Sequence, residues 1–352
     1  MNYSQTIATP KLFIGMDVHK KSRTVHFKTD LFDYKTMNMP AEPGCLYEYV
    51  QKHFSGHEVN CCYEAGCCGY WIARSLQQFN WKVLVVNPAD VPRTHKQDWQ
   101  KTDKIDCRKL CEHLQKNNLH SIYIPDEQQE QLRSLFRRRE HLSRQLRTIK
   151  NHIKSQLLYY GIKLPQQFDN PNWSHEMKQW IDSISWKYVT ASSAMHSRLK
   201  QLDFLWREQL DISNELRAYC RKHHKKDYYL YKSVPGIGGI TASAIIAELG
   251  DIRRFSRMDE LASVIGLVPG IYQSSENNIS LGLTRRSKSQ LRSLLIEAAW
   301  VAVRTDMVLQ SYYRKHAVKE PNKAIIKVAH KLLCRIRAVI SSCKPYQIGM
   351  VK

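Results

Sequence analysis

Residues 11–18, KLFIGMDV, form a short apolar run rich in strand-forming side chains, and an acid, Asp17, stands at its end. A polar turn follows, and residues 23–30, RTVHFKTD, resume with alternating character, so the two runs predict a β-hairpin. A further apolar strand is expected at 58–64, where EVNCCYE ends at Glu64. A third buried strand is expected at 81–88, where Pro88 stops it.

Helices are expected between and after these strands. One helix fits residues 69–79, and another fits residues 103–118, with Thr102 as its N-cap. Strands and helices that alternate over about 120 residues are typical of an α/β domain. We therefore expect an α/β domain over residues 1–126.

A long helical segment follows over about residues 127–160. Its apolar side chains recur at three-four spacing, which predicts a helix packed on one partner, although Arg139 interrupts the stripe. Pro165 and Pro171 break this helix, and a second helix is expected over 186–224. The two helices predict an antiparallel helical or coiled-coil arm within residues 127–227. The residues of the stripe are Leu132, Leu135, Leu142, Leu146, Ile149 and Ile153.

The pattern changes again from about residue 228. A Gly-rich turn in KSVPGIGGITASAIIAELGDIRRF lies between two helices, and further helices are expected at 256–266, 284–304 and 321–341. The stretch GLVPGIYQSSENN, residues 266–278, has the composition of a loop. Residues 228–352 are therefore expected to form a mostly α domain.

The positive charge is concentrated in the later part of the chain. The net charge is +22, yet residues 1–130 hold 16 Lys and Arg against 15 Asp and Glu. Residues 131–352 hold 38 against 17, and the segment 131–154 alone holds eight against one. A surplus confined to one region, with aromatic residues mixed into it, indicates a nucleic-acid partner. A basic surface that only keeps the protein soluble is the alternative.

The cysteines and the hydropathy pattern indicate a soluble cytoplasmic protein. No run approaches the roughly 20 apolar residues that cross a bilayer, and the polar start MNYSQTIATPK is not a signal peptide. Ten cysteines without a secretory signal argue against disulfides. The adjacent pairs Cys61-Cys62 and Cys67-Cys68 lack the spacing of zinc ligands, so buried reduced thiols in strand and turn are the favoured interpretation.

Four acids have the placement that a metal site needs. Asp17 and Glu64 each stand at the end of a predicted strand, and Asp103 and Asp106 lie three apart on one helix face. Carboxylates at strand ends converge at one edge of an α/β sheet, where ligands usually bind. Oxygen ligands of this kind suit Mg²⁺ or Mn²⁺, and paired ions promote phosphoryl displacement. Chance alignment of four acids among 32 is the alternative.

Three blocks around these acids carry a family resemblance. IGMDVHKK (14–21), YEAGCCGY (63–70) and QKTDKIDCRKL (100–110) resemble, in order and spacing, the D-E-D-D blocks of an insertion-sequence transposase family. That family also contains the Piv-type site-specific DNA invertases. The resemblance implies a RuvC-like domain of the RNase H superfamily, in which Asp17, Glu64, Asp103 and Asp106 bind Mg²⁺. Cys107 stands where the family usually has Ala.

The C-terminal half resembles the second domain of the same family. The matching blocks are residues 233–255, 262–275 and 283–304. In the first block, PGIGGITA is a tight turn at Gly236 and Gly238 that opens onto a helix N-terminus, where free N–H groups can hold a phosphate. Such a helix-hairpin-helix-like element would grip a DNA backbone, although a turn that only packs two helices has the same sequence.

The resemblance also implies a nucleophile. The family's serine, which is thought to form a covalent link to DNA phosphate, matches Ser274. Ser275 and Glu276 stand where the family usually has Gly, so either serine remains a candidate, and an ordinary polar turn is the alternative. Basic residues expected to contact nucleic acid lie after this serine, on the long helix and beside the acids. They are Lys101, Arg137, Arg138, Arg144, Arg147, Arg285, Arg286, Lys288 and Arg292.

The leading hypothesis is a transposase or site-specific recombinase that exchanges DNA strands through a serine and Mg²⁺. Its expected partners are the ends of a DNA element and a target. The family further implies a structured guide RNA encoded by the element, and strand exchange requires a homo-oligomer, a dimer or a tetramer. Two alternatives remain open. A RuvC-like nuclease would need the four acids but not Ser274, and a non-catalytic DNA- or RNA-binding protein would need neither.

Overall fold

The computed structural model describes residues 9–92, 102–170, 173–274, 277–284, 286–318 and 320–348, with residues 270–281 described by their backbone alone. The chain divides into two compact units, residues 1–124 and residues 125–352. No helix among the described residues is long and apolar enough to cross a membrane.

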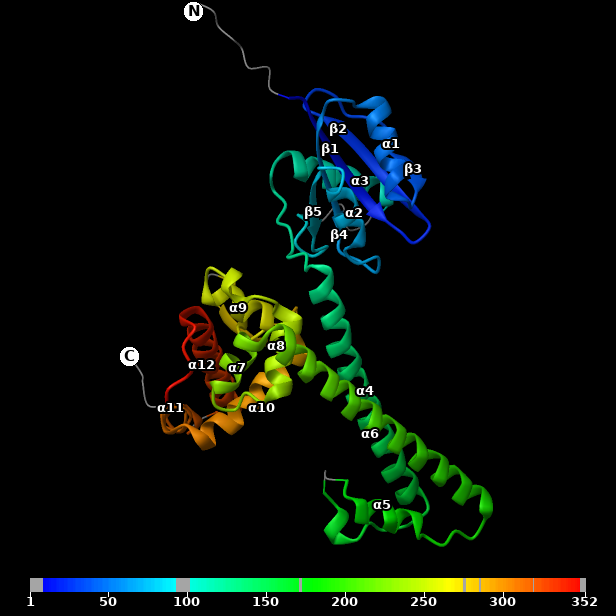
Figure 1. Cartoon of the computed structure of the whole chain (residues 1–352), viewed down its shortest axis with the longest axis vertical. Helices are drawn as coiled ribbons and strands as arrows, with labels where there is room; N and C mark the ends of the chain where they lie inside the picture. The colour runs from blue at the N-terminus through cyan, green and yellow to red at the C-terminus, as the bar shows by residue number, and fades with distance from the viewer. Residues whose placement is uncertain are drawn as a thin grey trace, which may run out of the picture. The chain divides into compact units, whose positions relative to one another are not determined.

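A mixed five-stranded sheet forms the centre of the first unit (Figure 1). Its strands stand in the order β3-β2-β1-β4-β5. The β1–β2 pair is antiparallel and confirms the predicted hairpin, whereas β1–β4 and β4–β5 are parallel. The bounds are β1 Lys11–Val18, β2 Ser22–Thr29, β3 Met37–Pro40, β4 Glu58–Glu64 and β5 Lys82–Val86.

Helices cover both faces of this sheet. Helices α1 (Pro43–His53) and α2 (Trp71–Gln77) pack on the face that carries Leu12, Ile14 and Met16 of β1. Helix α3 (Asp103–Gln115) packs on the opposite face, together with Phe13 and Cys62. The alternation of side chains along β1 therefore assigns its residues to two separate cores. The sequence analysis predicted neither β3, which has only four residues, nor α1, although proline is a favoured first residue of a helix.

Helix α3 lies unusually close to β1 at Gly15. A Cβ atom on Gly15 would stand 2.2 Å from the carbonyl oxygen of Cys107 and 2.7 Å from the backbone nitrogen of Cys111. The thiol of Cys111 donates to the carbonyl of Phe13 at 3.2 Å, and that of Cys107 donates to the carbonyl of Thr24 at 3.0 Å. Because Gly15 has no side chain, the helix backbone can rest directly on the strand.

Two long helices open the second unit and run antiparallel, as the sequence predicted (Figure 1). Helix α4 spans Glu127–Tyr159 and helix α6 spans Val189–His223. A hydrogen bond from Gln128 to Tyr219 and another from Gln209 to Ser143 fix the antiparallel direction. The expected break between them contains a 3₁₀ turn at Gln166–Phe168 and a short helix, α5 (His175–Asp182).

The apolar stripe of α4 divides between two cores. Leu132 packs in the core of the C-terminal helices, whereas Leu142, Leu146, Ile149 and Ile153 pack against α5 and α6 in a separate arm core. Leu135 is only partly buried, and Phe136 takes the buried position beside it. Helix α4 therefore joins the C-terminal core to the arm without interruption.

The remaining helices surround the first of these cores. They are α7 Lys225–Ser233, α8 Gly239–Leu249, α9 Met258–Ile265, α10 Ser289–Thr305, α11 Met307–Ala317 and α12 Pro321–Ser342, with a 3₁₀ turn at Ile252–Arg254. At Gly236, where φ is +83°, a Cβ atom would stand 2.1 Å from the carbonyl oxygen of Ala298 in α10. The predicted Gly-rich turn therefore packs tightly on α10.

The predicted loop at 266–278 is wrong. Strands β6 (Pro269–Ser274) and β7 (Asn277–Leu283) pair as an antiparallel hairpin, with Ile271 opposite Ser280. The polar and Gly-containing composition suggested a loop, but cross-strand pairing satisfies the backbone whatever the side chains are. The second unit is therefore mostly α with one small two-stranded sheet.

We predict that Gly15→Ala lowers the free energy of unfolding of the first unit by about 1–3 kcal/mol, the usual cost of overpacking. The added methyl group would collide with backbone atoms of α3, which cannot move aside as a side chain can. Urea denaturation followed by circular dichroism measures the change. Gly44→Ala is the matched control, because a Cβ atom there meets nothing within 4 Å. Equal stabilities of the two variants would contradict the prediction.

Candidate metal centre

Neighbouring parallel strands bring Asp17 and Glu64 to the same edge of the sheet. Met16 of β1 pairs with Tyr63 of β4, so the next residue on each strand is an acid. Asp17 lies two residues beyond Gly15, and Glu64 lies two residues beyond Cys62, so both share the face that α3 covers. Two residues far apart in the sequence thus project from one edge toward one helix.

The other two acids stand in the first turn of α3. The side chain of Thr102 accepts a hydrogen bond from the backbone N–H of Ile105, which confirms the predicted N-cap. Asp103 and Asp106 follow in the first turn, where negative charge interacts favourably with the helix dipole. The cap thus fixes where the helix begins, and with it the position of both acids.

Asp17 and Asp103 meet at this edge, together with His19. The Nε2 atom of His19 lies 3.5 Å from Oδ2 of Asp17 and 3.4 Å from Oδ2 of Asp103. One ligand atom from each of the three residues lies within 4.8 Å of the other two. Glu64 and Asp106 are not part of this group, although Glu64 lies on the next strand and Asp106 one helical turn away. The structure therefore brings together two of the four predicted acids.

His19 was not singled out from the sequence as a site residue. The signal available was its position two residues after Asp17, in the turn between β1 and β2. A histidine in a hairpin turn is usually a solvated residue, and only the meeting of β1 with α3 shows its relation to Asp103.

The charges of the acids converge on the buried thiol of Cys107. Burial raises the pKa of this thiol, and the negative charges of Asp17, Asp103 and Asp106 raise it further. Burial also raises the pKa of Cys62 well above the ordinary value, and the charge of Glu64 contributes. All four acids therefore act on the α3 face of the sheet, above thiols that stay neutral.

The cysteine prediction is confirmed for one pair and wrong for part of the other. All ten cysteines are free, and Cys61 and Cys62 are buried. Cys67 is exposed and Cys68 is half-buried, because the turn after β4 lies at the surface. In the described part of the chain, the group with metal-ligand geometry contains no cysteine.

The residues at this edge fit a divalent cation. The donors are carboxylate oxygens and one imidazole nitrogen, and the side chains of Asp17 and His19 are 31% and 51% exposed, so an ion can reach them. Carboxylate oxygens suit Mg²⁺ and Mn²⁺, and an imidazole is tolerated better by Mn²⁺. A divalent metal is thus the cofactor class that the donor set favours.

The predicted serine lies in the second unit. Ser274 is the last residue of β6, at the tip of the hairpin, rather than in a loop. Its rival Ser275 and the adjacent Glu276 lie outside the described residues, as do Lys101 and Arg285. The strand fixes the backbone at Ser274, so the position is more constrained than a loop would be.

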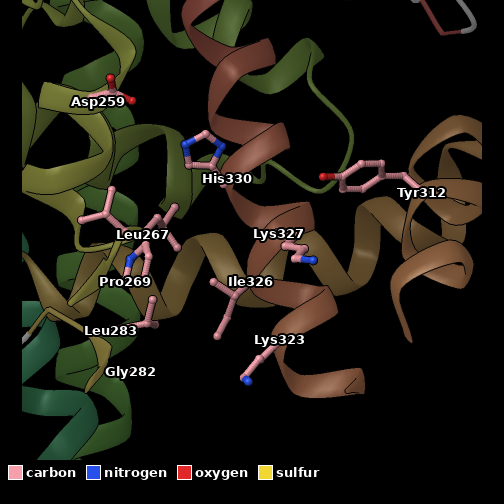
Figure 2. A pocket seen from close by; sticks show the side chains of 11 residues that line it. Asp259, Leu267, Pro269, Gly282, Leu283, Tyr312, Lys323, Ile326, Lys327 and His330 are labelled. Atoms are coloured by element: carbon pink, nitrogen blue, oxygen red, sulfur yellow. The ribbon is translucent and has the colours of Figure 1, made fainter. Parts of the chain in front are cut away.

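A pocket of about 510 Å³ borders the base of the same hairpin. Figure 2 shows Lys323, Ile326 and His330 of α12 facing Leu267 and Leu283 across it. The pocket therefore has mainly apolar walls and a basic side, and it lies at the end of the hairpin opposite Ser274. Its lining residues are Asp259, Leu267, Val268, Pro269, Gly282, Leu283, Tyr312, Lys323, Ile326, Lys327 and His330.

Two of the predicted nucleic-acid contacts share a buried carboxylate. Glu248 of α8 is 4% exposed and pairs with Arg133 and Arg137 of α4 and with Lys288, the N-cap of α10. Burial opposes ionisation of Glu248, but the hydrogen bonds and charges of Arg137 and Lys288 outweigh it and lower its pKa. Three cations around one carboxylate leave a positive surplus at the junction of three helices.

The other predicted basic contacts differ in their surroundings. Arg138, Arg144 and Arg147 are exposed along α4, and Arg286 is exposed before α10. Arg292 instead donates to the carbonyls of Gly266 and Thr284, at 3.3 and 3.0 Å, and so ties α10 to the end of α9 and to β7. Gly238 is the N-cap of α8, and a Cβ atom there meets nothing within 4 Å.

Two family models match the chain. A DEDD-type model described as a transposase matches residues 14–162. A second model, described as the transposase IS116/IS110/IS902 family, matches residues 228–314. The first match includes all four acids, and the second includes β6–β7, so together they cover about two thirds of the chain.

Individual relatives agree with these matches. The Coxiella burnetii transposase for insertion sequence element IS1111A is 24% identical over 83% of this chain and 80% of that protein. The pilin gene-inverting protein of Moraxella lacunata is 26% identical over 96% of this chain and 98% of that protein. A Sinorhizobium fredii protein proposed to be a transposase is 26% identical over 68% of this chain, which spans only 57% of that relative.

We predict that Asp17→Asn weakens Mn²⁺ binding at least about tenfold, because it removes a charged ligand from the group with Asp103 and His19. Titration calorimetry of the full chain with Mn²⁺ measures the affinity. Asp30→Asn is the matched control, since Asp30 is exposed and follows β2 at the end of the sheet away from Asp17. Unchanged binding in D17N, or equal losses in both variants, would contradict a metal site at this edge.

We also predict that Glu248→Ala costs about 3–5 kcal/mol in the second unit, because the buried Arg133 and the half-buried Lys288 would lose their counter-charge. The lowered pKa of Glu248 means that its contribution is present above about pH 4.5 and is lost as the pH falls through that lowered pKa. Guanidinium denaturation at pH 7 and at pH 3 measures both effects. Glu215→Ala, at an exposed position of α6, should change stability little at either pH.

Proposed function

This chain belongs to the IS116/IS110/IS902 family of transposases, and on that premise we propose that it cuts and rejoins DNA as an insertion-sequence transposase or site-specific recombinase. The relatives include insertion-sequence transposases and pilin gene-inverting proteins, so both outcomes, transposition and inversion, are represented among them. The proposal assigns the two chemical tasks of the reaction to the two units of the chain.

One observation carries the proposal. Asp17 on β1 and Asp103 on α3 lie 86 residues apart in the sequence, yet the fold places their carboxylates together at one edge of the sheet. In the proposed site, Glu64 and Asp106 complete the four-acid set from the adjacent strand and the next helical turn. This sheet with α3 on one face is the support that an RNase H-like, RuvC-like domain would provide.

The acids would hold one or two Mg²⁺ or Mn²⁺ ions. When bound, such ions lower the pKa of an attacking hydroxyl group and neutralise charge that develops on the phosphate. The protein's own part is to hold the carboxylates in fixed positions. The positive end of the α3 dipole interacts favourably with the negative side chains of Asp103 and Asp106 in the first turn.

Ser274 is the proposed nucleophile. Its Oγ atom would form a bond to a DNA phosphorus, one phosphorus–oxygen ester bond of the DNA would break, and the serine proton would pass to the released strand oxygen, which becomes a hydroxyl group. A hydroxyl group from another strand would then attack the phosphoserine ester and restore the serine. The number of phosphate esters is conserved, so rejoining requires no external energy source. Because Ser274 and the acids belong to different units, the reaction requires both to reach one phosphate.

The DNA partners follow from this reaction, and the RNA partner follows from the family resemblance. The substrates are the DNA ends of the element and a target, and we propose that a structured RNA encoded by the element guides the choice. Strand exchange needs at least two active sites, so we propose a homo-oligomer built through a coiled-coil arm at α4 and α6. The turn at Gly236 and Gly238, which leads into α8, is the proposed helix-hairpin-helix-like contact to the DNA backbone.

We predict that Ser274→Ala abolishes the covalent protein–DNA product while DNA binding stays nearly unchanged. The reason is that the substitution removes one hydroxyl group and no charge. Denaturing electrophoresis of the full chain with labelled element-end DNA, Mg²⁺ and the RNA that purifies with the protein detects the adduct.

Ser275→Ala is the matched control, and it should leave adduct formation largely intact. An adduct that persists in S274A but disappears in S275A would move the assignment by one residue. If DNA is cut and neither substitution matters, metal-dependent hydrolysis by the four acids replaces the serine mechanism. If D17N cuts DNA as well as the wild type, the acidic site is not the source of the activity.

A further inference from the structure

A basic pocket lies beside α3 in the first unit, and none of its residues was predicted from the sequence to bind anything. It has a volume of about 540 Å³ and forms between α3 and the segment that leads into β3. We call it the α3 pocket. Its lining residues are Lys35, Thr36, Lys104, Ile105, Arg108, Lys109 and Glu112.

The charge of the α3 pocket is strongly positive. Four of its residues are Lys or Arg, and Glu112 is the one acid in the lining. In the described parts of the chain, Lys35, Lys104 and Arg108 are all exposed, and no ion pair joins any of them to an acid. Cations that are gathered without counter-charges repel one another, so an anion in the pocket would be stabilised.

The side of the pocket opposite α3 is held in place by a buried histidine. His26 of β2 is fully buried, and its Nδ1 atom lies 2.8 Å from Oγ1 of Thr36. Its Nε2 atom lies 2.8 Å from a carboxylate oxygen of Asp33. Burial lowers the pKa of His26, the charge of Asp33 opposes this, and the charge of Arg108 adds to the lowering. The segment 33–36 is thus anchored to the sheet, so the pocket is formed in advance.

Helix α3 contributes both to the α3 pocket and to the acidic edge, with different side chains. Lys104 directly follows Asp103, and Arg108 lies one turn further on the same side as Lys104. Lys109 connects the faces, because it lines the pocket and its Nζ atom lies 3.9 Å from Oδ1 of Asp106. Its side chain is only 14% exposed, so this cation is held in position rather than free in solvent. A ligand in the pocket would therefore lie next to whatever the acids bind.

We propose that the α3 pocket binds the phosphodiester backbone of the nucleic-acid strand whose neighbouring phosphate lies at the acidic edge. This inference rests on the proposed function, which supplies a DNA strand there. Lys104 and Arg108 are neighbours one helical turn apart, with Cβ atoms about 5–6 Å apart, and can contact successive phosphate groups. Arginine can donate two parallel hydrogen bonds to one phosphate. The pocket fixes the path of the strand, and the acids act on it.

Lysine acetylation of the full chain tests the proposal residue by residue. The reagent is applied in EDTA, with and without a saturating single-stranded DNA oligonucleotide of 12 nucleotides, and mass spectrometry measures the rate at each lysine. We expect the bound strand to slow acetylation of Lys104 several-fold. Lys11 and Lys52 serve as internal references, since both are exposed and lie at the start of β1 and on α1, away from the pocket. Equal rates at Lys104 with and without the strand would overturn the proposal.

A pair of variants measures the charge contribution. Lys104→Gln with Arg108→Gln should reduce the slope of log Kd against log salt by about 1.4, or about 0.7 for each lost contact to a single strand. Lys11→Gln with Lys52→Gln removes the same charge from the same unit and should leave the slope unchanged. The charge-conserving pair K104R and R108K should keep the wild-type slope. Equal slopes for the two Gln pairs would also contradict strand binding at the α3 pocket.

Two further experiments distinguish this proposal from the proposed function. Asp17→Asn should lose metal-dependent cutting but keep the protection of Lys104, so a failure of the catalytic proposal leaves the pocket intact. RNA of the same sequence should protect Lys104 as DNA does, because the two share the phosphodiester group. Protection by RNA alone would contradict a DNA strand in the pocket.

Discussion

The contact between α3 and β1 at Gly15 is the constraint on which the first unit depends. A helix that rests on a strand backbone cannot slide or tilt without collision, because backbone atoms cannot change rotamer. The thiols of Cys107 and Cys111 add hydrogen bonds to strand carbonyls on either side of this point. The acids of the first turn of α3 are therefore held in register with Asp17 on β1. A larger residue at position 15 would raise the helix from the sheet and separate these carboxylates.

The second unit has a corresponding fixed point of a different chemical kind. Glu248 is a single buried carboxylate that gathers cations from α4 and from the start of α10. Arg292 and Gly236 add two more attachments to α10, through hydrogen bonds and through close backbone packing. The chain between α9 and α10, which includes the β6–β7 hairpin, is thus attached at both ends. The tip that carries Ser274 extends from a base that is hydrogen-bonded to α10.

The sequence patterns predicted the elements that repeat a simple period. The β1–β2 hairpin and the two long helices of the arm are examples, and the N-cap at Thr102 was predicted from its residue type. Features that depend on contacts between residues far apart in the sequence could not be predicted from local patterns. The β6–β7 hairpin is stabilised by pairing across its strands rather than by an apolar run, so its composition resembled a loop. His19 acquires its relation to Asp103 only when α3 packs on the sheet, and Lys104 and Arg108 become a pocket only opposite Lys35 and Thr36.

Helix α4 contributes side chains to two hydrophobic cores, and this limits how the arm can change in length. The apolar side chains of α4 in the arm core repeat every seven residues; they are Leu142, Leu146, Ile149 and Ile153. They must keep their angular position around the helix relative to Leu132, which lies in the other core. Seven residues make almost two whole turns, so an insertion of seven restores the helical phase and lengthens the arm by about 10 Å. An insertion of two or five residues would rotate one core away from its partner. Natural length variants of this arm should therefore differ by nearly whole numbers of turns, such as seven or eleven residues, inserted in both helices at matching levels.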